Sequence, residues 1–391
     1  MDDPASTTPG SGRAERPLPL HGCRVVERAA SPAGAYAGRL LATLGAEVVM
    51  LEPMEGSPLR QAAPMLPGED GGSALFAYLC AGKRSLQAPL DDPRVEALLA
   101  QADILIDDTP LLQRHAEGWD GEQLRHRHPQ LVAVSVLPFG AQGPKAGWRG
   151  EELNLVHASG EGFLLPNGLS HELFPDRPPL KIYGHFASYQ GGCVAALAAL
   201  AAWWARRDHG GQCVDVSIQD AMLLCGAFAL QRLGDGSLEH RSTRSFRYGG
   251  VFKARDGYVE LLTLEERQWQ GLVQLLGEPV WTRDERLGDS LERSRRGAEI
   301  NAHIRAWIQD HDCDGIVARA QALGVPAAKY RTPSDVVAGA HEAARGLFAT
   351  RYTATGRPYQ VLVAPYQFRL SPLRLGDTAG PSPHHAREVR A

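Results

Sequence analysis

A serine, a histidine and two glutamates are the side chains in this sequence whose types together fit acyl transfer. Ser188 follows His185 by three residues in the segment YGHFASYQGG, and Glu151 and Glu152 are adjacent. A serine hydroxyl forms an acyl ester when a base activates it, and a carboxylate can orient a histidine that serves as the base. A structural interpretation competes with this one: His185 as an ordinary packed histidine, and the glutamates as a solvated helix start near the positive end of its dipole. Whether His185 and Ser188 face each other depends on the geometry of their loop.

Length and charge limit the classes of protein that need to be considered. At 391 residues the chain is too long for one ordinary core, which predicts two or three folded units. Its formal net charge is −4, so it has no basic field that could hold nucleic acid or an anionic membrane surface. We therefore expect no nucleic-acid partner, and any anionic ligand must be held by a few local cations.

The cysteines and the apolar segments argue for a metal-free protein of the cytoplasm. The six cysteines include no CxxC pair and no neighbouring histidine at metal-ligand spacing, which argues against zinc and against a disulfide framework. Residues 1–20 are polar and lack the apolar core of a signal peptide, which predicts a disordered leader. The most apolar run, Gly191 to Trp204, is about 14 residues long, against the roughly 20 that a bilayer crossing needs. It is predicted to be a buried helix in a protein without a membrane partner.

The elements that must position these side chains alternate between strands and helices. CRVVERAA reads as a buried strand, and SPAGAYAGRLLATLGAEVVMLEP adds a loop, a helix over Ala35 to Leu44 capped by Gly45, and a second strand. A helix capped by Asp92, the strands ILIDD and LVAVSVLPFG, and a long apolar helix from Ala195 to Arg207 follow. Residues 21–225 are therefore predicted to form the first part of a large α/β domain with a mostly parallel sheet.

A smaller domain is predicted in the middle of the chain. YGGVFKARDGYVELLTL indicates a hairpin with its turn at Asp256-Gly257, and amphipathic helices follow at Trp269 to Leu276 and Ile300 to Ile308. Residues 226–332 are assigned to this small α+β domain with its linkers. Residues 333–391 are predicted to return to the large domain and to end in a tail.

Seven motifs follow one another in an order that carries more information than any of them alone. They are AGAYAGRLLATLGAEVVMLEP with SPLR after it, AGKRSL, ADILIDD, VSVLPFGAQGP, LAALAAWWARRDHGGQCVDVSIQDAML, YGGVFKARDGYVEL and GVPAA. In this order, over about residues 22 to 390, the chain resembles the family III CoA-transferases, whose relatives include formyl-CoA transferase and α-methylacyl-CoA racemase. The resemblance implies a Rossmann-like large domain built from both chain ends, a small central domain, and a dimer of interlocked subunits.

The resemblance also implies a site for coenzyme A. CoA carries a 3′-phosphate and a pyrophosphate, which need a few cations and glycine-opened backbone. The candidates are Ser31, Ala33, Gly34, Arg60, Lys83, Arg84 and Lys145. The competing interpretation is that Lys83 and Arg84 only solvate a loop.

Three positions depart from the family pattern near this site. Asp108 and Thr109 stand where the family often has asparagine and phenylalanine, and Met50 stands where it usually has lysine. Asp108 places negative charge where a phosphate-bearing ligand is expected nearby.

The family's catalytic aspartate falls on Ser188 when the chain is counted back from LAALAAWWARR. Family transferases use that carboxylate to attack the acyl-CoA thioester, form a mixed anhydride and then carry the CoA as a thioester. No aspartate lies between Asp176 and Asp208, so a shift of a few residues does not restore one. A serine can form neither an anhydride nor a thioester with CoA, which excludes the usual mechanism at this residue.

Three functions follow from these residues and this resemblance. We expect first a homodimeric family III CoA-transferase-like enzyme that acts on acyl-CoA, or a related acyl thioester, with altered chemistry. The second is a noncatalytic subunit that forms a heterodimer with an aspartate-bearing homologue. The third is a racemase or isomerase in which Glu151, Glu152 or His185 moves a proton, although Ser188 is a poor second base for that reaction.

Overall fold

The chain divides into two compact units. The computed structural model describes residues 16–68, 72–165, 175–225, 248–353, 355–373 and 376. The first unit combines Met1–Glu161, Ile182–Ala227 and Ala340–Ala391, and the second combines Gly162–Lys181 and Phe228–Gly339. The first unit therefore uses both ends of the chain, and residues 162–181 and 333–339, expected in the large domain, belong to the second unit. Most of the predicted leader, 1–20, lies outside the described residues.

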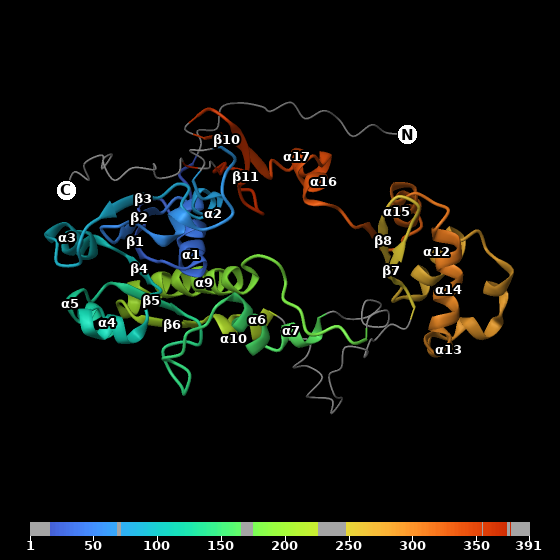
Figure 1. Cartoon of the computed structure of the whole chain (residues 1–391), viewed down its shortest axis with the longest axis horizontal. Helices are drawn as coiled ribbons and strands as arrows, with labels where there is room; N and C mark the ends of the chain where they lie inside the picture. The colour runs from blue at the N-terminus through green and yellow to red at the C-terminus, as the bar shows by residue number, and fades with distance from the viewer. Residues whose placement is uncertain are drawn as a thin grey trace. The chain divides into compact units, whose positions relative to one another are not determined.

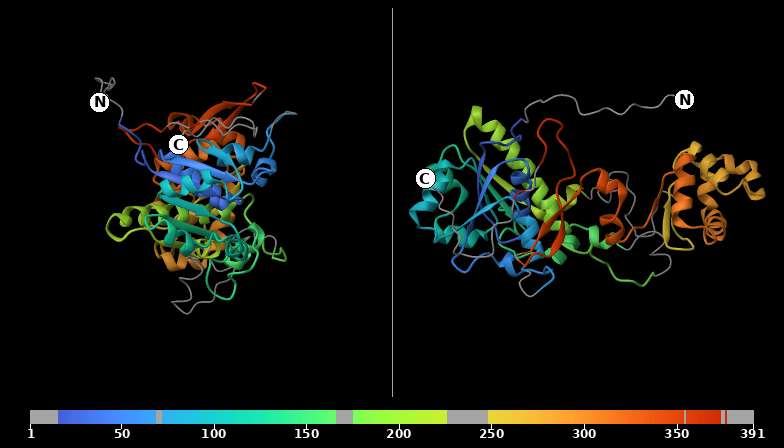
Figure 2. Two further views of the ribbon diagram at one scale, coloured as in Figure 1. Left: turned by 90° about the vertical axis from the view of Figure 1, so that its left-hand side faces the viewer. Right: turned by 90° about the horizontal axis from the view of Figure 1, so that it is seen from above.

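A six-stranded parallel sheet forms the centre of the first unit (Figures 1 and 2). Its order is β3-β2-β1-β4-β5-β6, and Val25 of β1 pairs with Val48 of β2 on one side and with Ile104 of β4 on the other. The strands are β1 Arg24–Arg28, β2 Glu47–Glu52, β3 Arg84–Gln87, β4 Ile104–Asp107, β5 Val132–Leu137 and β6 Cys213–Ser217. The predicted α/β fold with a parallel sheet is confirmed.

Both faces of the sheet are buried at its inner strands, which explains why β2, β4 and β5 are nearly continuous apolar runs. Val25 and Ile104 pack with α1 (Pro32–Thr43) and α9 (Phe186–His209) into one core cluster. Val26 and Leu105 alternate to the other face, where they pack with α3 (Pro93–Gln101) and α5 (Gly121–Arg127).

Helix α9 begins at Phe186, before the predicted apolar helix that runs from Gly191 to Trp204 and continues to Arg207. Glycine costs about 1 kcal/mol relative to alanine inside a helix, so the adjacent Gly191 and Gly192 need a structural reason. In the fold, a Cβ added at Gly192 would lie 2.6 Å from the carbonyl oxygen of Ala33. The glycine is there because α9 crosses the first turn of α1 at this point.

Among the described residues, α9 is also the one helix long and apolar enough to cross a membrane by length and composition. Of its most apolar window, 44% is buried in the fold, and Ala195, Ala199 and Ala202 belong to the core shared with α1. The predicted buried helix is therefore present, while the cytoplasmic location stays a prediction.

The second unit has its own sheet and core. Strands β7 (Gly250–Lys253), β8 (Tyr258–Leu261) and β9 (Ala327–Lys329) form an antiparallel sheet, and the predicted hairpin turn at Asp256-Gly257 joins the first two. Its helices are α12 Glu266–Leu275, α13 Ser290–Arg295, α14 Gly297–Ile308 and α15 Cys313–Ala322. Strands β7 and β8 and helices α12, α14 and α15 share one hydrophobic core cluster, against which Ala327 of β9 packs.

The remaining elements are short. They are η1 Pro58–Gln61, α2 Ala74–Leu79, α4 Leu111–Glu117, α6 Glu152–Ala158, α7 Glu161–Leu164, α10 Ile218–Cys225, η2 Val280–Arg283, η3 Glu285–Gly288, α16 Pro333–Val337, α17 Ala340–Ala344, β10 Phe348–Tyr352 and β11 Pro358–Leu362. Strands β10 and β11 pair as an antiparallel hairpin.

Candidate functional site

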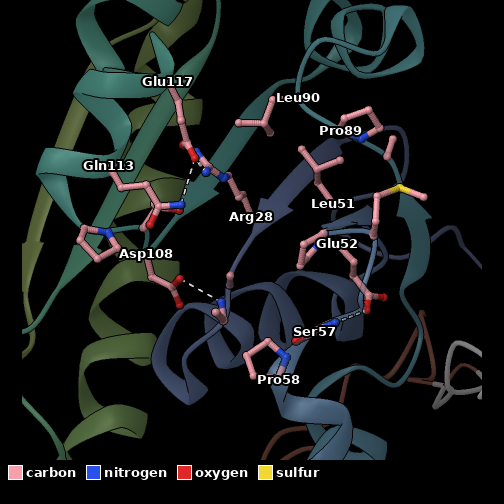
Figure 3. Close-up of a pocket in the computed structure, with 17 residues that line it drawn as sticks. Arg28, Leu51, Glu52, Ser57, Pro58, Pro89, Leu90, Asp108, Gln113 and Glu117 are labelled. Carbon is pink, nitrogen blue, oxygen red and sulfur yellow. Dashed lines mark hydrogen bonds and ion pairs between the residues drawn. The ribbon is translucent and has the colours of Figure 1, made fainter.

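A cavity lies at the carboxyl edge of the parallel sheet, where the strand order reverses. Because β2 and β4 flank β1, the loops after β1 and β4 diverge and open a crevice, which is where ligands bind in open α/β sheets. The cavity measures about 350 Å³. Side chains at the ends of β1, β2 and β4 line it together with neighbouring loops and α4, among them Arg28, Leu51, Glu52, Pro89, Asp108 and Glu117 (Figure 3).

Arg28 is the cation of this cavity. It is the last residue of β1, and its guanidinium donates to Glu117 Oε2 and lies 5.1 Å from the ring centroid of Trp119. Arg28 Nη1 and Asp107 Oδ2 are 3.8 Å apart, and among the described residues neither buried atom has a hydrogen-bond partner. Burial raises the pKa of Asp107, against the lowering effect of Arg114 and Arg28. Arg28 is thus held by Glu117, Trp119 and Asp107 at the cavity wall, with its Nη1 buried toward Asp107.

Asp108 occupies the position at the start of α1 where an anionic ligand would be expected. Its carboxylate accepts hydrogen bonds from the backbone amides of Ala30 at 2.9 Å and Ser31 at 2.7 Å. Ser31 in turn caps α1, because its hydroxyl accepts from the Gly34 amide at 3.3 Å. Burial raises the pKa of Asp108 to about 6, although these hydrogen bonds lower it. The protein itself therefore supplies the anion at this helix N-terminus.

The predicted CoA turn is consequently packed against the protein. Ala33 is fully buried in the core, and a Cβ at Gly34 would lie 2.8 Å from Asp108 Oδ2. Ala29 and Ala30, just before the turn, are the residues of this loop that line the cavity. A ligand in the cavity would meet the loop there.

Arg60 is held by Glu52, at the end of β2. Its Nε and Nη2 donate to the two carboxylate oxygens at 2.7 Å each, and the guanidinium lies 4.3 Å from the ring centroid of Phe76. Burial acts to raise the pKa of Glu52, but hydrogen bonds from Arg60, Ser85 and the Ser57 amide outweigh it and lower that pKa. Arg60 therefore neutralises a carboxylate of the cavity wall.

Lys83 lies beneath α1 and is fully buried. Its Nζ is 2.6 Å from Glu27 Oε2 and 2.7 Å from the carbonyl oxygen of Ala35. Burial raises the pKa of Glu27 to about 7, against the lowering effect of Lys83. In this arrangement the ammonium group serves an internal ion pair.

The remaining two cations lie away from the cavity. Arg84 is at the amino end of β3, the opposite end of the sheet, and its exposed side chain lies 3.5 Å from Glu47. Lys145 belongs to a separate groove of about 400 Å³ beside α6, where its Nζ lies 5.5 Å and 5.6 Å from the ring centroids of Phe139 and Trp148. The structure therefore does not gather the predicted cations into one phosphate site.

Ser188 and Glu152, in contrast, are in direct contact. Ser188 lies in the first turn of α9, and its Oγ donates to Glu152 Oε2 at 3.0 Å. The same carboxylate accepts from the amides of Ala187 at 2.7 Å and Ser188 at 3.1 Å. Glu152 comes from the first turn of α6, so two helix starts meet at this pair.

His185 and Glu151 flank the pair with other partners. His185 is the residue before α9, and its ring lies edge-to-face with Tyr189 at 6.3 Å between centroids. Glu151 is the residue before α6 and is exposed, and its backbone amide donates to Asn154 Oδ1 at 3.0 Å. Of the four residues proposed for acyl transfer, the structure joins Ser188 to Glu152.

The sequence reasoning missed Arg28, Glu52 and Glu117 as cavity residues. A signal was available for two of them, because Arg28 and Glu52 are the last residues of buried strands whose carboxyl ends meet at one edge. No group of three or more His, Cys, Asp and Glu side chains in the described part of the chain could hold a metal ion. The expected absence of a metal stays a prediction.

Replacement of Asp108 by asparagine should tighten the binding of CoA to the isolated chain by about 2- to 5-fold, the usual value of one charge at a helix N-terminus. Asparagine keeps one oxygen acceptor for the Ala30 and Ser31 amides and removes the negative charge. Titration calorimetry at pH 5.5 and 7.5 measures the effect.

The pH dependence provides an internal control. Because the pKa of Asp108 is about 6, the wild-type carboxylate is largely protonated at pH 5.5 and should then repel CoA less. The asparagine variant has no carboxylate at residue 108, so any change of its CoA affinity between pH 5.5 and 7.5 comes from other groups, including CoA itself. Equal affinities of wild type and variant at pH 7.5 would contradict a role for this charge.

Comparisons with known proteins agree with the motif order and with the fold. The family described as CoA-transferase family III matches residues 20–385. The probable CoA-transferase Rv1866 of Mycobacterium tuberculosis is 34% identical over 321 residues. The match covers 79% of this chain and 39% of Rv1866, so this chain spans well under half of the length of Rv1866. The succinyl-CoA:(R)-benzylsuccinate CoA-transferase subunit BbsE of Thauera aromatica is 26% identical, with 91% of this chain and 90% of that protein covered. A solved CaiB/BaiF family protein from Brucella suis is 28% identical and has a TM-score of 0.79, covering 93% of this chain and 96% of that one. The chain belongs to CoA-transferase family III.

Proposed function

We propose that this protein binds an acyl-CoA, or a related acyl thioester, and transfers a group from it by chemistry altered at residue 188. The contact of 3.0 Å between Ser188 Oγ and Glu152 Oε2 carries the proposal. It places a hydroxyl and a carboxylate together at the position that the family resemblance assigns to the nucleophile. An acyl-accepting group is therefore available even though residue 188 is a serine.

The cavity supports a nucleotide-containing ligand of this kind. It lies at the strand-order reversal, and Ala29 and Ala30, which line it, come just before the first turn of α1. That turn packs against α9, which begins with the Ser188 segment. A ligand with its nucleotide in the cavity and a long flexible arm would run along α1 toward Ser188.

Calorimetric titration with free CoA and a small panel of acyl-CoAs, followed by a CoA-transfer assay, tests the proposal. Saturable binding to the isolated chain and turnover with at least one acyl-CoA and carboxylate pair are the expected results. Arg28→Ala should weaken binding, whereas Arg84→Ala, at the other end of the sheet, should leave it unchanged. Absence of binding at millimolar CoA would contradict the proposal.

A noncatalytic subunit is the second candidate, and a relative provides the reason. BbsE is named as a subunit of its CoA-transferase, and the Ser188 position of this chain lacks the family's aspartate. In this case an aspartate-bearing homologue would form a heterodimer with the chain and supply the nucleophile. Copurification with such a homologue, together with transfer activity only in the mixture, would select this function.

Proton transfer of the racemase or isomerase type is the third candidate. Glu152 or His185 could remove the proton beside the acyl carbonyl, but Ser188 is a poor second base for the opposite face of the α-carbon. Exchange of the α-proton of an acyl-CoA with solvent deuterium would support this reaction. Its loss in Glu152→Gln or His185→Ala would identify the base.

We further propose that α9 contributes to the interface of a homodimer with interlocked subunits. Cys193, Leu197, Ala201 and Trp204 recur at helical spacing on its exposed side, and the side chains of Leu197 and Trp204 are 70% and 68% exposed. A stripe of this composition favours burial against a second subunit. Sedimentation velocity of the purified chain should show a dimer, and a monomer across micromolar concentrations would contradict the proposal.

A further inference from the structure

The N-terminus of α9 holds a carboxylate that belongs to another helix. Glu152 Oε1 accepts from the Ala187 amide at 2.7 Å, and Oε2 accepts from the Ser188 amide and hydroxyl at 3.1 Å and 3.0 Å. Ser188 is 8% exposed, and Glu152 is only partly buried. This carboxylate is therefore fixed from one side by α9 and keeps contact with the surface.

The hydrogen-bond geometry leaves one lone pair for chemistry. A carboxylate has about four lone-pair sites, and the three donors of α9 use three of them. One site on Oε1 remains. Ser188, in contrast, has its hydroxyl directed at the carboxylate, so its oxygen would become a nucleophile only after giving its proton to an already hydrogen-bonded carboxylate.

We propose that Glu152 is the carboxylate that accepts the acyl group in this protein, and that Ser188 is a positioning residue for it. The inference rests on the proposed function and names the residue that performs it. A carboxylate is the side chain that can both form an anhydride with an acyl group and carry CoA as a thioester, which a serine hydroxyl cannot do.

The reaction is balanced without any further reagent. A Glu152 oxygen attacks the thioester carbonyl, the carbon–sulfur bond breaks, CoA leaves as a thiolate, and a glutamyl–acyl anhydride forms. The thiolate attacks the glutamyl carbonyl, the donor acid leaves as its carboxylate, and Glu152 becomes a glutamyl-CoA thioester. The acceptor carboxylate then attacks this thioester, and the returning thiolate attacks the new acyl group, which releases the product acyl-CoA and the free Glu152 carboxylate.

The donors of α9 fit the charge that develops in these steps. When a nucleophile attacks the Glu152 carbonyl, its oxygen becomes an oxyanion. The amides of Ala187 and Ser188 and the Ser188 hydroxyl already lie 2.7 to 3.1 Å from the carboxylate oxygens. Preorganised donors at such distances stabilise an oxyanion in the transition state.

Peptide mapping of the full-length protein tests the assignment. Wild type is incubated with succinyl-CoA, quenched with borohydride or with hydroxylamine, digested and analysed by mass spectrometry. Borohydride reduces a glutamyl thioester to an alcohol and hydroxylamine converts it to a hydroxamate, so either change should map to Glu152. Glu152→Gln should lose the label and lower CoA transfer by roughly 10³-fold or more.

Two further variants separate chemistry from folding. Glu122→Gln changes a glutamate in the first turn of another helix, α5, and should keep both label and activity. Ser188→Ala should keep the label on Glu152 while lowering kcat more than it raises KM, as expected for a positioning residue. Circular dichroism and thermal unfolding check that Glu152→Gln retains α9.

The possible outcomes distinguish a failure of the role of Glu152 from a failure of the proposed acyl-CoA function. Transfer with the label on Ser188, or with no label on Glu152, overturns the role of Glu152 but leaves the acyl-CoA function intact. Binding and transfer both absent in the isolated wild-type chain overturn the proposed function and this inference together.

Discussion

Replacement of Lys83 by methionine should lower the free energy of unfolding by about 3–5 kcal/mol, the usual loss when one partner of a buried ion pair is removed. Methionine has a similar length, so the variant removes the charge with little change of volume. It leaves Glu27, which is 1% exposed, without the ammonium group at 2.6 Å. Urea unfolding followed by circular dichroism measures the loss.

The pH dependence of this variant has a definite sign. Burial raises the pKa of Glu27 to about 7 even with Lys83 present, and removal of the lysine should raise it further. A raised folded-state pKa means that the stability from this group is present at low pH and is lost as pH rises through the folded-state pKa. The loss caused by Lys83→Met should therefore be smaller at pH 5 than at pH 8.

A double replacement provides the control. Glu27→Gln combined with Lys83→Met removes both charges and should recover part of the lost stability. A single variant that is as stable as wild type at pH 8 would show that the pair contributes nothing. The structure also indicates that any weaker CoA binding by Lys83 variants would report damage beneath α1, since the ammonium group does not line the cavity.

Replacement of Gly192 by alanine should destabilise the protein more than the same change at the adjacent Gly191. A Cβ at Gly192 would lie 2.6 Å from the carbonyl oxygen of Ala33, a backbone atom that can move only if α1 and α9 separate. At Gly191 the nearest atoms are Cγ1 and Cγ2 of the buried Ile218 at 2.8 Å and 3.1 Å, so one side chain, not a backbone segment, must shift. Both changes gain the same helix propensity, so their difference compares a backbone contact with a side-chain contact.

We expect the two alanine variants to differ by about 2 kcal/mol, within the usual range for overpacking. Thermal unfolding of the pair measures the difference. Since α9 also carries Ser188, Gly192→Ala should lower any CoA-transfer activity as well. Equal midpoints for the two variants would mean that the helices separate without cost.

The fold class could be predicted because it depends on periodicity and order along the chain. Val25, Val48 and Ile104 lie in apolar runs separated by a capped helix, and such alternation leads to a parallel sheet. The hairpin at Asp256-Gly257 could be predicted for the same reason, because its turn chemistry is local. The family resemblance likewise depended on the order of motifs.

The start of α9 at Phe186, before the two glycines, and the roles of the cations could not be predicted in this way. Local propensity disfavours the glycines, and only the contact with Ala33 explains them. Lys83 and Arg60 are cations in a plausible ligand motif, yet each meets a carboxylate of a strand, Glu27 in β1 or Glu52 in β2. Glu27 lies 56 residues before Lys83 and Glu52 lies 8 residues before Arg60, so neither pair follows a helix or strand spacing that a local pattern would show.

The amino-acid sequence thus determined the α/β architecture, the family and the absence of an aspartate at residue 188, because these depend on residue type, spacing and order. Tertiary structure decided which carboxylate lies next to residue 188, where the family has its catalytic aspartate. From the sequence, His185, Glu151 and Glu152 were all candidates to act with Ser188, and the meeting of the starts of α6 and α9 selects Glu152. The meeting of two helix starts is a property of packing, since it depends on how both helices lie against the same sheet.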